Sequence, residues 1–212
     1  MSGLTPLPSS FFNRPTLTVA SDLIGCRLVR SMPSGARLVG RIVETEAYTQ
    51  DDPAFHGWNL VDQETGELKR EGRGTDLFAA PGMGYVYLIY GMYWLLNVVT
   101  EPAGTGGAVL IRAVEPVEGI DVMRAHRSNI DRDVNLTNGP GKLTIAFGID
   151  DTFHRADLTT SPLYFMEPNK PFDGQIATSS RIGISRGVER EWRYFVDGHP
   201  YVSPATPSGE KG

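Results

Sequence analysis

The stretch RIVETEAY, residues 41–48, has the alternation of a β-strand, and the rest of the chain is interpreted from it. Residues two apart in a strand point to the same face, which places Glu44, Glu46 and Tyr48 together with Ile42. The small residues between them form an opposite face suited to a core. Two carboxylates and an aromatic ring on one face indicate either a solvated surface or the wall of a pocket.

Short β-rich segments outnumber long helical ones around this strand, and no regular βαβ rhythm is present. The sequence therefore predicts an α+β fold: a single mixed domain with a curved antiparallel sheet, surrounding helices and a protruding β-hairpin. The hairpin is expected over residues 85–100, with its break at Tyr90-Gly91-Met92. Further strands are expected near residues 28–29, 106–116, 179–184 and 192–203, and helices after Pro15, from Pro116 and after Asn138.

The length of 212 residues suits one sizeable core, so we predict one domain over residues 1–212, with flexible ends at about 1–10 and 203–212. Residues 49–83 are polar and read as a long loop, and such loops are often functional. The single cysteine, Cys26, excludes an internal disulfide and is expected in the core.

No apolar run approaches the ~20 residues that span a bilayer, and the N-terminus lacks the pattern of a signal peptide. We therefore expect no membrane partner and a cytoplasmic protein, nucleoid-associated in a prokaryote or nuclear in a eukaryote. The net charge of −5 by itself argues against nucleic-acid binding. Two locally basic tracts, residues 68–73 and 181–193, read as solvated surface on charge alone.

Arg112 interrupts the apolar strand AVLIRAV and raises the question of a partner. A buried guanidinium needs a carboxylate or several carbonyls, and Glu44 or Glu46 on a neighbouring strand would serve. Such a carboxylate pair could act as an acid and a base, or as a base and its organiser. The alternative is an exposed strand face for the glutamates and an edge strand with Arg112 in solvent.

The hairpin is rich in aromatic residues. Tyr85, Tyr93 and Trp94 are interpreted as core residues, whereas Tyr87 and Tyr90 are left open. A large aromatic side chain at an exposed hairpin tip is unusual unless something covers it, and Tyr90 could wedge into a base stack.

Other polar candidates give weaker signals. Asn97 is the one amide in WLLNVV and must be satisfied if it is buried, either by a turn or by a ligand. His56 lies in a loop, and the four histidines have no ligand spacing, so neither a metal nor a cofactor is predicted. The GPGK stretch ending at Lys142 is not a P-loop, although its helix N-terminus could receive a phosphate.

Taken together, these tracts carry a family resemblance. The chain resembles the 3-methyladenine DNA glycosylases of the alkyladenine type over most of residues 11–203. The matching tracts, in family order, are GRIVETEAY, His56, YVYLIYGMYWLLN, AVLIRAVEPVEG, NGPGKLTIAFGI, SRIGI and WRYFVDGHPYVS. The resemblance implies a monofunctional enzyme of base excision repair that removes alkylated or deaminated purines from DNA.

The resemblance also implies roles for individual residues. Glu46 would activate water, and Arg112 would fix that carboxylate and its water, while Glu44 would be structural. Tyr48 with His56 would stack on one face of the extruded base and Tyr87 on the other. Asn97 would line the pocket and disfavour guanine. The residues implied at the DNA are Tyr90, Met92, Arg73, Lys142 and Arg181.

The expected partner is double-stranded DNA with a damaged purine, bound by a monomer. The main departure from the family pattern lies in residues 57–77, where only Arg73 keeps a recognisable place. One alternative is therefore a catalytically inactive lesion- or DNA-binding module of the same fold. Another is a hydrolase of free nucleosides or sugars that uses the glutamate pair.

Overall fold

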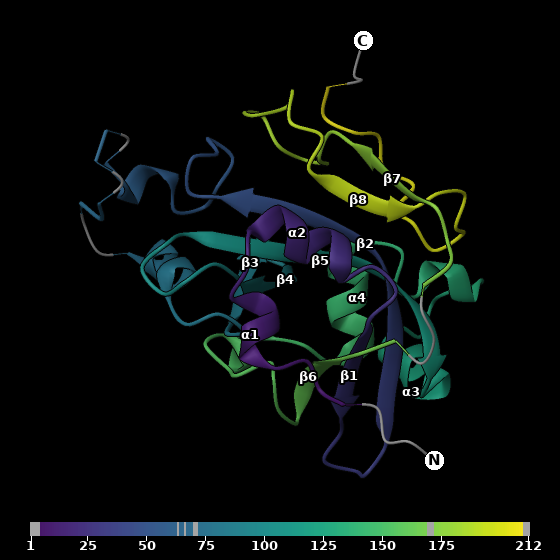
Figure 1. Cartoon of the computed structure of the whole chain (residues 1–212). Helices are drawn as coiled ribbons and strands as arrows, with labels where there is room; N and C mark the ends of the chain where they lie inside the picture. The colour runs from purple at the N-terminus through teal and green to yellow at the C-terminus, as the bar shows by residue number, and fades with distance from the viewer. Residues whose placement is uncertain (1–4, 63, 66, 70–71, 169–171, 210–212) are drawn as a thin grey trace.

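The computed structural model describes residues 5–62, 64–65, 67–69, 72–168 and 172–209 as one α+β domain built on a curled antiparallel sheet (Figure 1). The strand order is β3-β4-β5-β2-β1-β6, and β8 pairs with β2 and with β7. The strands are β1 (Arg27–Ser31), β2 (Arg37–Thr49), β3 (Gly84–Ile89), β4 (Tyr93–Val99), β5 (Gly107–Glu118), β6 (Leu163–Met166), β7 (Ile176–Ser179) and β8 (Arg193–Val196). The helices are α1 (Ser9–Phe12), α2 (Thr16–Asp22), α3 (Ile120–His126) and α4 (Pro140–Phe147), with 3-10 turns η1 (Trp58–Leu60), η2 (Arg73–Phe78), η3 (Asp133–Asn135) and η4 (Asp151–Phe153).

The strand predicted from RIVETEAY is β2, and it organises the sheet. One edge pairs with β5, whereas the other pairs first with β1 and then, from Glu44 to Glu46, with β8. The β2–β5 register shifts on both sides of Glu44, which marks a β-bulge. The strict alternation predicted above is therefore wrong at this point. Ile42 and Val43 both join the main core, and Ile42 is separated from the carboxylates.

The main core lies between the sheet and its covering helices. Val19 and Ala20 of α2 and Phe147 of α4 are completely buried in it. The Thr45 hydroxyl of β2 donates to the Ala20 carbonyl at 2.8 Å, which ties α2 to the sheet. Cys26 is buried, as predicted, and burial raises the pKa of its thiol to about 12.

The predicted long loop, residues 49–83, contributes a second apolar cluster. Its Phe55, Leu77 and Phe78 pack with Tyr85 of β3 and Ala108 of β5. The loop is thereby fixed against the same strands that form the hairpin.

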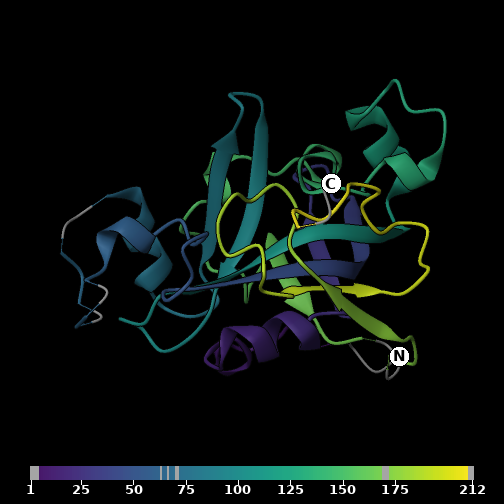
Figure 2. The ribbon, with the colours of Figure 1, turned by 90° about the horizontal axis from the view of Figure 1, so that it is seen from above.

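The hairpin β3–β4 is confirmed and stands out from the body, on the side away from α1 and α2 (Figure 2). Two predicted boundaries are wrong. Pro116 does not open a helix, because β5 continues to Glu118 and α3 starts only after Gly119, which has a φ of 77°. Residues 180–184 are irregular, and the strand in this region is β7, which ends at Ser179.

The two ends predicted to be flexible include packed residues. Leu7 is buried and its amide donates to the Phe165 carbonyl at 2.9 Å. Ser203 is buried as well, and the flexibility of the two ends stays a prediction. Residues 1–4 and 210–212 of those ends, like 70–71 of the basic tract, lie outside the described residues. Within the described part of the chain, no helix is long and apolar enough to cross a membrane.

Candidate active site

A cavity of about 950 Å³ lies between the hairpin, the loop after β2 and the C-terminal segment. Its volume is at the upper end of the ~300–1,000 Å³ that is common for ligand pockets. Aromatic and polar residues line it together with residues 182–186 and 203–205. The predicted site residues on its wall are Tyr48, His56, Tyr87, Tyr90, Asn97, Arg112 and Lys142.

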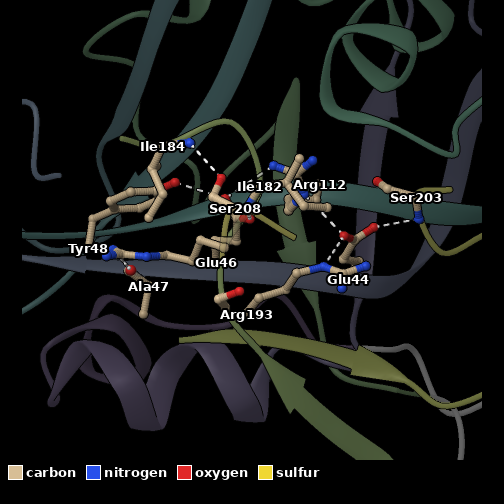
Figure 3. Close-up of polar contacts among 12 residues, drawn as sticks. Glu44, Glu46, Ala47, Tyr48, Arg112, Ile182, Ile184, Arg193, Ser203 and Ser208 are labelled. Carbon is tan, nitrogen blue, oxygen red and sulfur yellow. Dashed lines mark hydrogen bonds and ion pairs between the residues drawn. The ribbon is translucent and has the colours of Figure 1, made fainter. Parts of the chain in front are cut away.

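Glu46 is completely buried behind this wall, and donors reach both of its carboxylate oxygens (Figure 3). Oε2 accepts from the Tyr48 hydroxyl at 2.8 Å and from Nη1 of Arg112 at 3.1 Å. Oε1 accepts from the backbone amide of Ile182 at 2.7 Å. Two of these donors are side chains and the third is a main-chain amide, so both carboxylate oxygens are fixed in place.

Glu44 is the second buried carboxylate, and it binds the same arginine, Arg112, that binds Glu46. Its Oε1 accepts from Nε of Arg112 at 3.1 Å and from Nε of Arg193 at 2.7 Å, and its Oε2 accepts from the Ser203 amide at 2.7 Å. Burial alone would raise the pKa of this carboxyl, but Arg112, Arg193 and the Ser203 hydrogen bond more than offset it and hold the pKa below its usual range. Arg112 thus bridges both carboxylates from the central strand β5, and the exposed alternatives for all three residues are excluded.

Tyr48 lines the cavity and also contacts Glu46. Burial and the nearby Glu46 charge raise the pKa of its phenol well above the usual range, so the hydroxyl remains a donor at neutral pH. The Arg181 guanidinium lies 4.6 Å from the centroid of the Tyr48 ring.

Arg181 was predicted to contact DNA, and the structure contradicts this. Its side chain is completely buried and forms an ion pair with the buried Asp52. It also donates to the carbonyls of Ala47, at 2.9 Å, and Gly187, at 3.2 Å. A guanidinium enclosed in this way cannot reach a phosphate without unpairing a buried charge, which is costly.

The other aromatic wall is a cluster around His56. Its Nδ1 lies 2.7 Å from the Tyr85 hydroxyl, and its ring centroid lies 5.0 Å from that of Tyr87. Desolvation and the Arg73 charge lower the pKa of His56, which keeps the imidazole neutral at pH 7. Burial and the Glu46 charge raise the pKa of Tyr87 to about 12. His56 therefore lies against Tyr87, whereas the resemblance grouped it with Tyr48.

Three further predicted residues, Asn97, Lys142 and Arg73, each donate a hydrogen bond within the protein. Asn97 is buried in β4, donates to the Tyr85 carbonyl at 3.1 Å and lines the cavity. Lys142, in the first turn of α4, donates to the Asn138 side chain at 2.7 Å. Nη2 of Arg73 donates to the Val86 carbonyl at 2.6 Å, so this arginine is tied to β3.

The hairpin tip carries exposed apolar side chains. Tyr90 is 82% exposed at a φ of 54°, and Met92 is 63% exposed. Tyr93, interpreted above as core, is 39% exposed and lines the cavity, so that interpretation is wrong. Tyr85 is buried as predicted, and its hydroxyl is hydrogen-bonded to His56, which lines the cavity.

Sequence reasoning missed the contributions of Ile182, Asp52, Arg193 and Ser203. Ile182 and Ser203 act through backbone amides, which carry no residue-type signal. Asp52 and Arg193 sit in polar segments that read as surface. Only the partner contacts across the fold identify them.

The family model for Methylpurine-DNA glycosylase (MPG) matches residues 10–200. The chain belongs to this family. A protein of Salinibacter ruber named "Putative 3-methyladenine DNA glycosylase" is 64% identical over 97% of this chain and 100% of its own length. Proteins with the same name from Chlorobium luteolum and Rubrobacter xylanophilus are each 44% identical, over 97% and 86% of this chain and 100% and 90% of their own lengths.

Membership of the methylpurine-DNA glycosylase family makes this chain a DNA glycosylase, a hydrolase of N-glycosidic bonds that acts in DNA repair. The family match covers the buried carboxylates, the hairpin and all of the cavity lining except residues 203–205. Among the described residues, no group of three or more His, Cys, Asp or Glu side chains is arranged to hold a metal ion.

Proposed function

We propose that this protein extrudes a damaged purine from duplex DNA and hydrolyses its N-glycosidic bond with a water activated by Glu46. The observation that carries the proposal is the buried Glu46–Arg112 pair beneath an aromatic cavity, next to a hairpin with an exposed tyrosine tip. A hydrolase of free nucleosides or sugars would not need an exposed tyrosine at a hairpin tip, because its small substrate has no base stack to fill.

The chemistry follows from the charge at Glu46. As the bond to the base breaks, positive charge builds on the sugar, and an ionised carboxylate stabilises it. The same carboxylate takes a proton from the attacking water, a contribution of about 10²–10⁴ in rate. The Tyr48 hydroxyl covers Oε2 in the free protein, and a small movement of it gives a water in the cavity access to that oxygen.

The cavity walls suit an extruded base. A base in the duplex stack is out of reach, so it must be flipped at a cost of a few kcal/mol. Stacking against Tyr48 and Tyr87 returns roughly 1–3 kcal/mol for each contact. We infer that Tyr90, which is exposed at the hairpin tip, fills the vacated position in the duplex.

The test is an excision assay on duplex oligonucleotides that carry 3-methyladenine, hypoxanthine or ethenoadenine, followed by alkaline cleavage of abasic sites. We expect strand cuts with the wild type and none above background with Glu46→Gln, which keeps the size of the side chain. The lesion panel separates alkylated from deaminated substrates. Binding of lesion DNA by both proteins without any cut would establish the inactive binding module instead.

A further inference from the structure

Arg181 is a buried cation that the proposed reaction leaves without a role. Its guanidinium is paired with Asp52 and lies between two aromatic rings, 4.6 Å from the centroid of Tyr48 and 5.3 Å from that of Trp192. It also donates to the carbonyl of Ala47, which directly follows Glu46 in β2. One side chain thus contacts the strand that carries the catalytic carboxylate, the loop after that strand and a ring that lines the cavity.

The residue after Arg181 makes the decisive contact. The Ile182 amide donates to Oε1 of Glu46 at 2.7 Å, and Figure 3 shows Ile182 directed at that carboxylate. Residues 180–184 are irregular, so no sheet ladder fixes this amide. The position of Ile182 therefore depends on how its neighbour Arg181 is held.

The C-terminal segment holds the same loop from the other side. The Ser208 amide donates to the Arg181 carbonyl at 2.9 Å, and the Ser208 hydroxyl accepts from the Ile184 amide at 3.1 Å (Figure 3). Two hydrogen bonds with Ser208, one through its amide and one through its hydroxyl, therefore hold the backbone of residues 181 and 184, and the Arg181 side chain adds a buried ion pair.

We propose that Arg181, paired with Asp52, is a positioning residue that holds the Ile182 amide on Glu46 and supports the Tyr48 ring. Through these two contacts it sets the orientation of the carboxylate toward water and base. The proposal rests on the proposed function for its consequence in excision, although the placement of Ile182 is measurable without DNA. It predicts that Arg181 affects the chemical step and leaves DNA affinity unchanged.

The main test variants are Arg181→Lys and the double variant Asp52→Leu/Arg181→Met. The lysine keeps the charge but cannot form the bidentate pair. The double variant removes both charges and leaves no unpaired ion, and such replacements of buried pairs are often neutral for stability. Arg190→Met is the matched control, because Arg190 lies on the same segment and also packs on Trp192, at 4.4 Å from its ring centroid.

The first readout is hydrogen exchange of the Ile182 amide in the DNA-free protein. We expect exchange about tenfold faster or more in both main variants, because the amide is no longer held on Oε1 of Glu46, and no change in Arg190→Met. The second readout is single-turnover excision at saturating enzyme. We expect it to fall about 100-fold in the main variants, as when a reacting group is misplaced by about 1 Å.

The third readout separates positioning from a phosphate contact. A lost phosphate contact would reduce the slope of log Kd for undamaged duplex against log salt by about 0.9. We expect the slope and the affinity of both main variants to equal those of the wild type. A folded variant with wild-type Ile182 exchange, or with a reduced salt slope, overturns the proposal. If the wild type removes no base, the proposed function fails, and the amide exchange still decides whether Arg181 places Ile182.

Discussion

At the scale of single residues, the site depends on how buried charges are paired. Glu44 and Glu46 contribute two negative charges, and Arg112 and Arg193 two positive ones, so this buried group is neutral as a whole. An unpaired buried charge is costly, whereas a complete network is stable and rigid. Rigidity is useful here because the carboxylate must face one direction.

Removal of Arg112 should therefore cost stability as well as activity. We expect Arg112→Ala to lower the free energy of unfolding by about 3–5 kcal/mol, because it leaves two buried carboxylates short of a partner. Urea unfolding measures this. The matched control is Arg41→Ala, which breaks an ion pair with the partly exposed Glu115 and should cost no more than about 1 kcal/mol. Equal stability of Arg112→Ala and wild type would contradict the buried bridge.

The sequence named Glu44 or Glu46 as the partner of Arg112 if that arginine is buried, because an arginine within an apolar strand has few possible partners, and the structure shows both pairs. It failed for Arg181, which stands in a polar segment that looks solvated. The partner that buries it, Asp52, is distant in sequence, and only the packed fold brings the two together. A local sequence pattern cannot predict an ion pair between residues so far apart in the chain.

At the scale of elements, the hairpin β3–β4 presents its tip to solvent and its base to the cavity. We expect Tyr90→Ala to slow single-turnover excision about 5- to 150-fold, the equivalent of losing roughly 1–3 kcal/mol of stacking. Stability should change by less than about 0.5 kcal/mol because the side chain is exposed. Tyr90→Leu keeps an apolar wedge and should retain more activity. Unchanged excision in Tyr90→Ala would show that the Tyr90 side chain does not contribute to base extrusion.

Helix α2 is joined to β2, the strand that carries Glu46, through Thr45, and this contact is testable. Thr45→Val keeps the shape but deletes the donor to the Ala20 carbonyl, which is then left buried and unsatisfied. We expect a loss of about 1–3 kcal/mol in the free energy of unfolding. Thr45→Ser retains the hydroxyl and serves as the control in thermal or urea melts. A valine variant at least as stable as the serine variant would show that the hydrogen bond contributes nothing.

Strand alternation and local turn and helix-end signals predicted most elements, including β2, the hairpin, α2 and α4. It failed where the backbone departs from regular geometry. The bulge at Glu44 breaks the alternation, and Pro116 continues β5 where local propensity favoured a helix start. The four-residue strand β6 was too short to give a pattern. These features are fixed by pairing with neighbouring strands, which the sequence does not display.

At the scale of the whole molecule, an overall charge of −5 coexists with membership of a DNA glycosylase family. The buried ion pairs do not resolve this contrast. The acids Glu44, Glu46 and Asp52 are matched by an equal number of arginines, Arg112, Arg193 and Arg181, so the charges outside these pairs still sum to −5. The net charge therefore does not show which surface meets DNA.

The same internal pairing predicts acid sensitivity of the whole fold. The pKa of Glu44 is below its usual value in the folded protein, so the unfolded chain takes up the proton first as the pH falls. This contribution to stability is fully present above the unfolded pKa, about 4.3, and is lost as the pH drops through the folded value. We expect the wild-type free energy of unfolding, measured in urea, to decrease from pH 5 to pH 3.

Glu44→Gln isolates that contribution, since it keeps the side-chain size and removes the titrating group. At pH 7 it should be less stable than the wild type, because Arg193 loses its carboxylate partner. Its stability should then fall less steeply than that of the wild type between pH 5 and pH 3, so the two curves converge toward acid. Parallel curves would show that the acid response originates in other carboxylates and that the Glu44 pairing does not link the fold to pH.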